Sequence, residues 1–164
     1  MTKEQYIKIT EPLRNNPCKA KCVKKINRRL TGMVFLTYPL HLVLLFLKKD
    51  PWLLRAVFVP AVSFVLLTAA RRLINTPRPY EKFGMPPVIE KDTSGNSFPS
   101  RHVFSVFIIA MTIFYQYPVL GIVLGIVGVG IAVIRVLGGV HEPKDVIAGA
   151  VTGILCGVIG FYLI

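Results

Sequence analysis

The chain contains few cysteines and few acidic side chains, and each shortage excludes a kind of protein. Its three cysteines, Cys18, Cys22 and Cys156, are odd in number and lack the spacing of a disulfide framework, which argues against a small secreted domain. Cys18 and Cys22 have no histidine or further cysteine close by, so we expect no zinc site there. The eight Asp and Glu residues form no cluster suited to a metal ion, and we expect neither a metal nor another cofactor.

The N-terminal segment, residues 1–31, lacks the apolar stretch of a cleavable signal peptide, and none is expected. It holds nine Lys or Arg residues and two Glu residues. Two structures remain open for it: an amphipathic helix from Ile7 onward, broken near Pro12 and Pro17, or a loose basic arm. We predict a segment that lies on the membrane surface, followed by a membrane-embedded domain over residues 32–164.

What the chain does contain is apolar sequence in long runs. Hydrophobic residues make up 53% of it, and the mean hydropathy of +0.58 is too high for an ordinary soluble domain. The formal net charge of +12 lies mostly outside these runs. A nucleic-acid-binding protein would carry such a charge on a soluble fold, so we expect anionic lipid rather than nucleic acid as the partner.

Five apolar segments predict an all-α, integral membrane helix bundle with about five transmembrane helices. The segments cover residues 32–47, 52–70, 102–117, 119–137 and 145–164. Each approaches the roughly 20 residues that a helix needs to span a bilayer, although the first and third are short. The last two segments carry glycines four residues apart, which let helix backbones approach closely in lipid. These glycine pairs are Gly121 with Gly125, Gly149 with Gly153, and Gly153 with Gly157.

The alternating direction of these helices places the polar ends of four of them on one face of the membrane. The second helix ends near Arg71, and the third starts near His102. The fourth ends just beyond Arg135, and the fifth starts at Asp145. We therefore expect the clusters of arginine and histidine at these ends to lie together, on the same face as the basic N-terminal segment.

The first two clusters suit the binding of a phosphate group. Arg71 and Arg78 flank a turn, and guanidinium groups offer paired donors to phosphate oxygens, although such residues are also common beside membrane helices. Ser100 is placed to cap the third helix, with His102 in its first turn, where free backbone N–H groups attract an anion. Two interpretations of His102 stay open: a donor of a proton to a leaving oxygen, or an incidental interfacial histidine.

The third cluster combines Arg135, His141 and Asp145. A charge inside the last turns of an apolar helix is costly, so a functional role is the default hypothesis for Arg135. Asp145 falls in the first turn of the fifth helix, where it can accept the Nδ1–H of His141, fix its tautomer and raise its nucleophilicity. The adjacent Glu142 is a rival partner that we expect to point elsewhere.

Taken in order, these residues resemble the signature of the type 2 phosphatidic acid phosphatase superfamily, the lipid phosphate phosphatases. That signature reads Lys-x6-Arg-Pro, then Pro-Ser-Gly-His, then Ser-Arg-x5-His-x3-Asp. The same spacing occurs here in Arg71-x6-Arg78-Pro79, Pro99-Ser100-Arg101-His102 and Ile134-Arg135-x5-His141-x3-Asp145. The likeness covers residues 71–145 in detail, and the chain is similar to bacterial membrane members of the family, the undecaprenyl-diphosphate phosphatases.

The resemblance implies a role for each residue. His141 would attack phosphorus and become a phosphohistidine, and Asp145 would orient it. His102 would protonate the departing oxygen and then help to activate the hydrolytic water. The family needs no metal for this reaction. The phosphate would be held by Arg71, Arg78, Ser100, Arg101 and Arg135.

Three positions depart from the family pattern. Arg71 replaces Lys, which keeps the charge and changes its geometry. Arg101 replaces Gly, which adds a cation beside the site and favours a more anionic head group such as a diphosphate. Ile134 replaces Ser and removes a hydroxyl. The family also commonly has six membrane helices, against five here.

The expected function is hydrolysis of a lipid phosphate or diphosphate, with undecaprenyl diphosphate, in recycling of the cell-wall lipid carrier, as the leading substrate. The alternatives are a phosphatidylglycerophosphate or phosphatidate phosphatase and, more remotely, a non-enzymatic lipid-binding membrane protein. We expect a multi-pass protein of the plasma membrane. The side of the active site stays open, because the basic segment 1–31 favours the cytoplasmic face and the resemblance favours the outer face. The sequence does not determine the oligomeric state.

Overall fold

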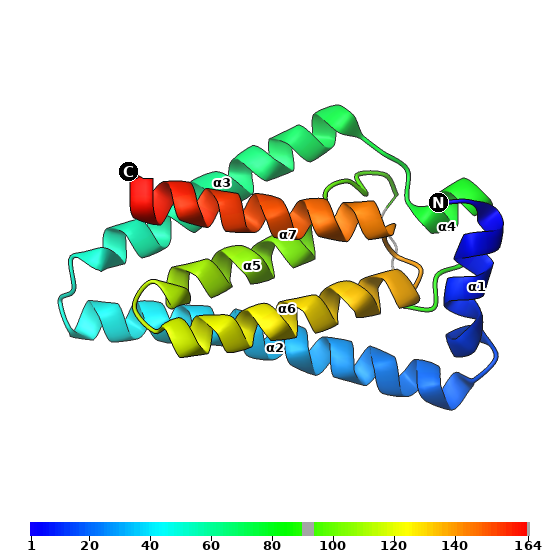
Figure 1. Ribbon diagram of the computed structural model, residues 1–164, viewed down its shortest axis with the longest axis horizontal. Helices are drawn as coiled ribbons and strands as arrows, with labels where there is room; N and C mark the ends of the chain where they lie inside the picture. The colour runs from blue at the N-terminus through cyan, green and yellow to red at the C-terminus, as the bar shows by residue number, and fades with distance from the viewer. Residues whose placement is uncertain (90–93, 164) are drawn as a thin grey trace.

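Helices packed side by side make up the chain over the residues that the structure describes, 1–89 and 94–163 (Figure 1). In this computed structural model the long helices form a bundle, and two short helices, α1 and α4, lie at one end of it. The helices are α1 (Lys3–Arg14), α2 (Pro17–Leu47), α3 (Trp52–Ile74), α4 (Pro79–Phe83), α5 (Arg101–Phe114), α6 (Pro118–Leu137) and α7 (Pro143–Val158), followed by the π-helical turn η1 (Ile159–Leu163). The prediction of an all-α membrane bundle is confirmed. Ile164, the end of the fifth predicted segment, lies outside the described residues.

The five predicted membrane helices are all present, but they differ in length. In the described part of the chain, four of them (α2, α3, α6 and α7) are long and apolar enough to cross a membrane. The remaining helix, α5, has 14 residues and packs against α6 and α7 in the middle of the bundle (Figure 1). Its Val103, Phe104 and Val106 are fully buried. Because neighbouring helices rather than lipid cover α5, it does not have to match the thickness of the bilayer.

Large apolar side chains cover the outside of the long helices. Leu73 in α3 is 87% exposed and Val119 in α6 is 78% exposed. In water such a surface would drive aggregation, whereas lipid chains solvate it favourably. The helix backbones satisfy their own hydrogen bonds, as a membrane interior requires. The outer surface of the bundle is therefore suited to contact with lipid.

The helix α2 begins much earlier than the predicted start at residue 32. The side chain of Asn16 accepts the backbone N–H of Lys19 at 3.0 Å, and Pro17 occupies the first turn, so the chain carries a local start signal. Lys and Ala are good helix formers, and they continue the helix through the basic residues that precede the apolar run. The basic residues therefore mark where α2 leaves the lipid, but the helix itself continues through them.

The helix α1 lies across the end of the bundle, at the same end as α4 (Figure 1). It begins at Lys3 rather than Ile7 and continues through Pro12, so the predicted break near that proline is wrong. The predicted break near Pro17 is confirmed. The Tyr6 hydroxyl donates to the Gly139 carbonyl at 3.3 Å, which ties α1 to the loop between α6 and α7.

Glycines on α7 allow it to pack tightly on α5. A Cβ atom at Gly149 would lie 2.6 Å from the carbonyl oxygen of Ser100, and one at Gly157 would lie 2.5 Å from Cβ of Met111. Gly153 shows the same close approach, so the predicted role of these three glycines in helix packing is confirmed. Gly125 in α6, by contrast, has nothing within 4 Å of an added Cβ.

Candidate active site

Four helix ends meet at the end of the bundle where α1 and α4 lie, as the helix count predicts (Figure 1). They are the C-terminal ends of α3 and α6 and the N-terminal ends of α5 and α7. A polar cavity of about 220 Å³ opens among them. Its lining includes five of the eight predicted site residues, namely Arg71, Arg78, Arg101, His102 and His141. The other three, Ser100, Arg135 and Asp145, are buried and are not part of the lining.

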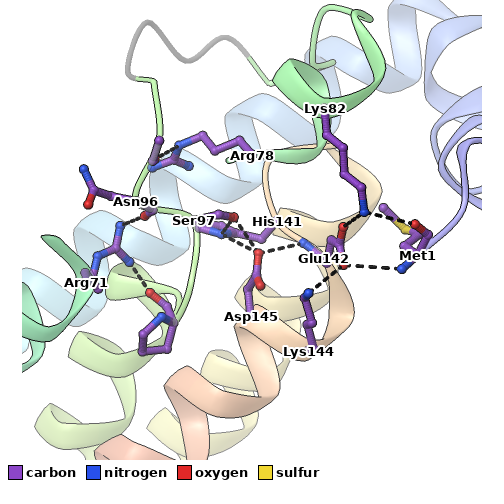
Figure 2. Close-up of polar contacts among 12 residues, drawn as sticks. Met1, Arg71, Arg78, Lys82, Asn96, Ser97, His141, Glu142, Lys144 and Asp145 are labelled. Atoms are coloured by element: carbon purple, nitrogen blue, oxygen red, sulfur yellow. Dashed lines mark hydrogen bonds and ion pairs between the residues drawn. The ribbon is translucent and has the colours of Figure 1, made fainter. Parts of the chain in front are cut away.

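His141 and Asp145 form a buried pair beside this cavity (Figure 2). The backbone N–H of His141 donates to the carbonyl of Arg135 at 3.3 Å, in the turn that follows α6. Asp145 lies in the first turn of α7, with Pro143 at its start, as predicted. The Nδ1 atom of His141 is 3.5 Å from Oδ2 of Asp145. The other ring nitrogen, Nε2, is therefore the one left for chemistry in the cavity.

Burial holds His141 in its neutral form. The pKa of His141 is lowered to about 4, chiefly by desolvation and to a smaller extent by the nearby Arg78, while the contact with Asp145 opposes the shift. A neutral imidazole at physiological pH has an unprotonated nitrogen. With Nδ1 facing Asp145, that lone pair belongs on Nε2, which is the state a nucleophile requires.

Glu142 points away from His141, as predicted (Figure 2). Its carboxylate lies 3.4 Å from each of three amines, those of Met1, Lys82 and Lys144. The backbone N–H of Glu142 donates to Oδ2 of Asp145 at 3.0 Å. The side chain of Glu142 thus joins the N-terminal amine, α4 and α7, and its backbone helps to orient Asp145.

The segment from Gly95 to Ser100 connects the arginines to the histidine pair. Arg71, in the last turn of α3, donates to the carbonyl oxygens of Asn96 and Pro99 (Figure 2). Arg78 donates through Nε to the carbonyl of Gly95 at 3.1 Å. Arg71 therefore holds this segment in place, a role that the sequence did not predict for it.

Three buried donors at this end have no hydrogen-bond partner among the described residues. They are Nη1 of Arg78, Nε of Arg135 and Oγ of Ser100. Ser100 is the N-cap residue of α5, as predicted, but its side chain caps no backbone N–H. Its own N–H donates to the carbonyl of Asp145 at 2.8 Å. Buried donors are nearly always paired, so these three atoms are suited to a bound anion.

The remaining predicted residues, Arg101 and His102, line the cavity from the start of α5. His102 is half-buried in the first turn of α5, and Arg101 beside it is exposed. The guanidinium of Arg101 lies 5.7 Å from the centre of the Phe64 ring on α3. The exposed Arg72 also lines the cavity, which adds a cation to the predicted set.

Besides Arg72, two further residues of the site were missed from the sequence, Glu81 and Ser97. Glu81 accepts the N–H of Arg78 at 2.7 Å and that of Gly95 at 3.0 Å. The capping-box spacing of Glu81, three residues after Arg78, could have found it. Ser97 donates to Oδ2 of Asp145 at 2.5 Å, across 48 residues of sequence, and no local pattern marks that contact.

Comparisons with known proteins agree with this geometry. A profile of the PAP2 superfamily matches residues 52–164. The bacitracin transport permease protein BcrC of Bacillus licheniformis is 33% identical over 86 residues, which cover 51% of this chain and 42% of BcrC. The matched part thus spans less than half the length of that relative.

Two crystal structures have the same fold. LpxE of Aquifex aeolicus superposes with a TM-score of 0.74 at 24% identity, covering 96% of this chain and 92% of LpxE. A PAP2-type phosphatidylglycerolphosphate phosphatase from Bacillus subtilis superposes with a TM-score of 0.61 at 21% identity, covering 94% of this chain and 90% of that protein. With the four long apolar helices, this shared fold is that of a multi-pass membrane protein, as predicted.

Proposed function

This chain belongs to the PAP2 superfamily, and we propose that it is a membrane phosphatase that hydrolyses a lipid phosphate or diphosphate through a phosphohistidine on His141. The observation that carries the proposal is an excess of buried positive charge beside a neutral histidine. Arg71, Arg78 and Arg135 are each at most 6% exposed. Two carboxylates lie near these three arginines, Asp145 and Glu81, since Glu142 is already paired with amines. Burying charge without compensation is costly, and a phosphate dianion supplies the missing negative charge.

The first step of the proposed reaction is attack on phosphorus. The Nε2 lone pair of His141 forms the N–P bond, and the bond from phosphorus to the leaving oxygen breaks. His102 gives its proton to that oxygen. Arg78, Arg135 and Ser100 donate to the phosphoryl oxygens and stabilise the charge that develops on them.

In the second step water attacks the phosphohistidine. The N–P bond breaks, inorganic phosphate leaves, and the pair of electrons returns to Nε2 of His141. His102, now neutral, accepts the proton from the attacking water. Asp145 keeps the ring in one orientation through both steps. At the end of the cycle His141 is neutral and His102 is protonated again, as at the start.

A groove beside the cavity supports a lipid as the substrate. It has a volume of about 330 Å³, is lined by Phe35, Phe64 and Ser105, and shares Arg101 and His102 with the polar cavity. Its two phenylalanines come from α2 and α3 and are partly exposed on the lipid-facing side. An apolar chain in this groove would place its phosphate next to His102.

The number of cations at the cavity mouth supports a diphosphate rather than a monophosphate. Arg72 and Arg101 line the cavity in addition to Arg71 and Arg78. A diphosphate carries more charge over a longer group, and guanidinium groups bind it well. We propose undecaprenyl diphosphate, in recycling of the cell-wall lipid carrier, as the first substrate to test. Phosphatidylglycerophosphate is the second candidate, because the Bacillus subtilis phosphatase named for that lipid shares the fold.

The test is phosphate release by the purified protein in detergent. Undecaprenyl diphosphate, phosphatidylglycerophosphate and phosphatidate are compared under the same conditions, with Arg101→Gly as the specificity variant. We expect the diphosphate to be hydrolysed with the highest kcat/KM, and Arg101→Gly to reduce that preference. Release from none of the three lipids would refute the phosphatase proposal, and an unchanged preference in the variant would refute the role of Arg101.

Independence of metal ions is part of the proposal. Among residues 1–89 and 94–163, no group of three His, Cys, Asp or Glu side chains is placed to hold a metal ion. We expect phosphate release to continue at the same rate after treatment with EDTA and removal of the chelated ions. A loss of activity that added Mg²⁺ or Mn²⁺ restores would contradict this expectation.

Two arguments about the side of the membrane oppose each other. The basic residues of α1 and of the start of α2 lie at the site end and favour the cytoplasmic face. Recycling of a lipid carrier favours the outer face. The native Cys18 and Cys22 are exposed near the start of α2 and report on this end directly. In a Cys156→Ala background, labelling of intact cells by a membrane-impermeant maleimide would place the site outside, and labelling only after lysis would place it inside.

A further inference from the structure

Ser97 contacts both residues of the histidine–aspartate pair (Figure 2). It is fully buried, with an exposed fraction of 0%. Its Oγ is 2.5 Å from Oδ2 of Asp145 and 3.3 Å from Nδ1 of His141. The direct distance from Nδ1 to Oδ2 is 3.5 Å, which is longer than a good hydrogen bond.

The donor and acceptor roles in this group follow from the chemistry of a hydroxyl. A carboxylate accepts only, so the single proton of Ser97 goes to Asp145, and the short distance is typical of an O–H···O⁻ bond. The lone pairs of Oγ are then left for the Nδ1–H of His141. Ser97 therefore accepts from the ring and donates to the carboxylate at the same time.

We propose that Ser97 is a positioning residue for the phosphotransfer reaction, which orients His141 and holds its proton on Nδ1 so that the Nε2 lone pair faces phosphorus. This inference rests on the proposed function of the same site. Ser97 acts through His141 and Asp145 and does not touch the substrate. It adds a third member to the pair that the sequence motifs predict.

The backbone around Ser97 fixes the hydroxyl in place. Its N–H donates to the carbonyl of Thr76 at 2.8 Å, in the loop between α3 and α4. The carbonyls of Asn96 and Pro99, on either side of it, accept from Arg71. Arg71 thus holds the segment from Gly95 to Ser100 that carries the hydroxyl. Through this segment Arg71 connects the C-terminal end of α3 to the nucleophile.

Substitutions at this position separate the hydrogen bond from the volume of the side chain. Ser97→Ala removes the hydroxyl and leaves Nδ1–H of His141 with only the carboxylate of Asp145, 3.5 Å away, which favours rotation of the ring or transfer of the proton to Nε2. Ser97→Cys keeps most of the volume and offers only a weak donor. Ser63→Ala is the matched control, since Ser63 lies in α3 and is not part of the cavity lining.

The first experiment measures kcat and KM of these three variants with the lipid that the wild-type protein hydrolyses. We expect Ser97→Ala and Ser97→Cys to lower kcat by about 10- to 100-fold, as for other side chains that orient a catalytic group, with KM within about 3-fold. Ser63→Ala should match the wild-type protein. A rise in KM at constant kcat would overturn the proposal, because it would indicate a role in binding. Full activity of Ser97→Cys would overturn it too, because volume alone would then be sufficient.

A double-mutant cycle tests whether Ser97 acts through Asp145. If it does, the loss in Ser97→Ala/Asp145→Asn will be smaller than the product of the two single losses. Losses that multiply would show an independent, purely structural role and would refute the proposal.

The tautomer of His141 gives a readout that needs no substrate. We expect the ¹⁵N spectrum of the wild-type protein to show the proton on Nδ1, and Ser97→Ala to shift it toward Nε2. An unchanged tautomer would contradict the inference. If the wild-type protein released phosphate from no lipid, the proposed function would fail, while this spectrum would still decide the role of Ser97.

Discussion

The two ends of the bundle differ in the kind of side chain that packs there. At the site end, arginine, histidine and aspartate side chains are buried and held by backbone carbonyls and by one another. At the opposite end, Trp52 stacks on Tyr115 with ring centres 3.8 Å apart and planes 8° from parallel. Phe161 packs against the Trp52 ring at 5.5 Å. Gln116 completes this end by donating to Asp50 at 3.1 Å.

This difference separates the part of the molecule that does chemistry from the part that closes the fold. Aromatic rings at a membrane interface bury a large area and anchor the helix ends. Buried arginines do the opposite, because each costs desolvation energy unless a partner compensates it. The site end is therefore suited to bind an anion but is less stable than an apolar core would be. The opposite end joins α3, α5 and η1 without the desolvation cost of buried arginines. Each end contains a histidine and an arginine, which makes matched substitutions possible.

The largest difference in catalytic activity should appear between variants of the two buried histidines, His141 and His41. We expect His141→Ala to reduce phosphate release by at least about 10⁴-fold, because the nucleophile is lost. His41 lies toward the other end, where its ring meets Tyr117 at a centroid distance of 5.9 Å. His41→Ala should retain the wild-type kcat. Rates per folded molecule, with folding checked by size-exclusion chromatography in detergent, provide the measurement. Comparable activity of His141→Ala and wild type would rule out the phosphohistidine mechanism.

The arginines should differ next. Arg135→Gln removes a buried donor near the predicted phosphate position, and we expect kcat/KM to fall by about 10²- to 10³-fold, the usual cost of losing one such donor. Arg55, at the opposite end, lies 5.5 Å from the centre of the Trp52 ring. Arg55→Gln should leave kcat/KM unchanged. Equal losses in the two variants would mean that Arg135 contributes only to folding.

The titration of His141 should move in opposite directions in two variants. In the wild-type protein the pKa of His141 is lowered to about 4, chiefly by burial. The ring should therefore stay neutral as the pH falls through the range where an ordinary histidine titrates, around pH 6.5. Asp145 raises this pKa, so Asp145→Asn should lower it further, whereas Arg78 lowers it, so Arg78→Gln should raise it. The ¹³Cε1 shift of His141, followed from pH 7.5 to the lowest pH at which the protein stays folded, measures this. Shifts of the same sign in both variants would contradict the assigned electrostatics.

The smallest effect should come from the aromatic end. Trp52→Leu keeps an apolar side chain but loses the stack on Tyr115, which is worth about 1 kcal/mol. We expect a lower thermal midpoint in detergent and an unchanged kcat per folded molecule. A fall in kcat without a fall in the midpoint would show that the two ends are coupled, contrary to the separation described above.

Much of the fold could be predicted because its signals are local. The apolar runs predicted all five apolar helices, and the prolines and charges between them marked the turns, as at residues 48–51. The start of α2 at Pro17 was missed, since the basic residues before the apolar run end the lipid contact and not the helix. The break assigned near Pro12 was wrong: Pro12 lies in the last turn of α1, where it removes one backbone hydrogen bond only two residues before the helix ends at Arg14.

The spacing of the motifs determined which side chains gather at the site, and the alternation of helices determined that they do so at one end. His141 and Asp145 are four residues apart at the start of a helix, so their contact is a local matter. The tertiary structure alone decided that Arg71 donates to Asn96 and Pro99, and that Ser97 contacts both His141 and Asp145. Those partners are far apart in sequence, and only the packing of α3, α5 and α7 against one another brings them within hydrogen-bonding distance.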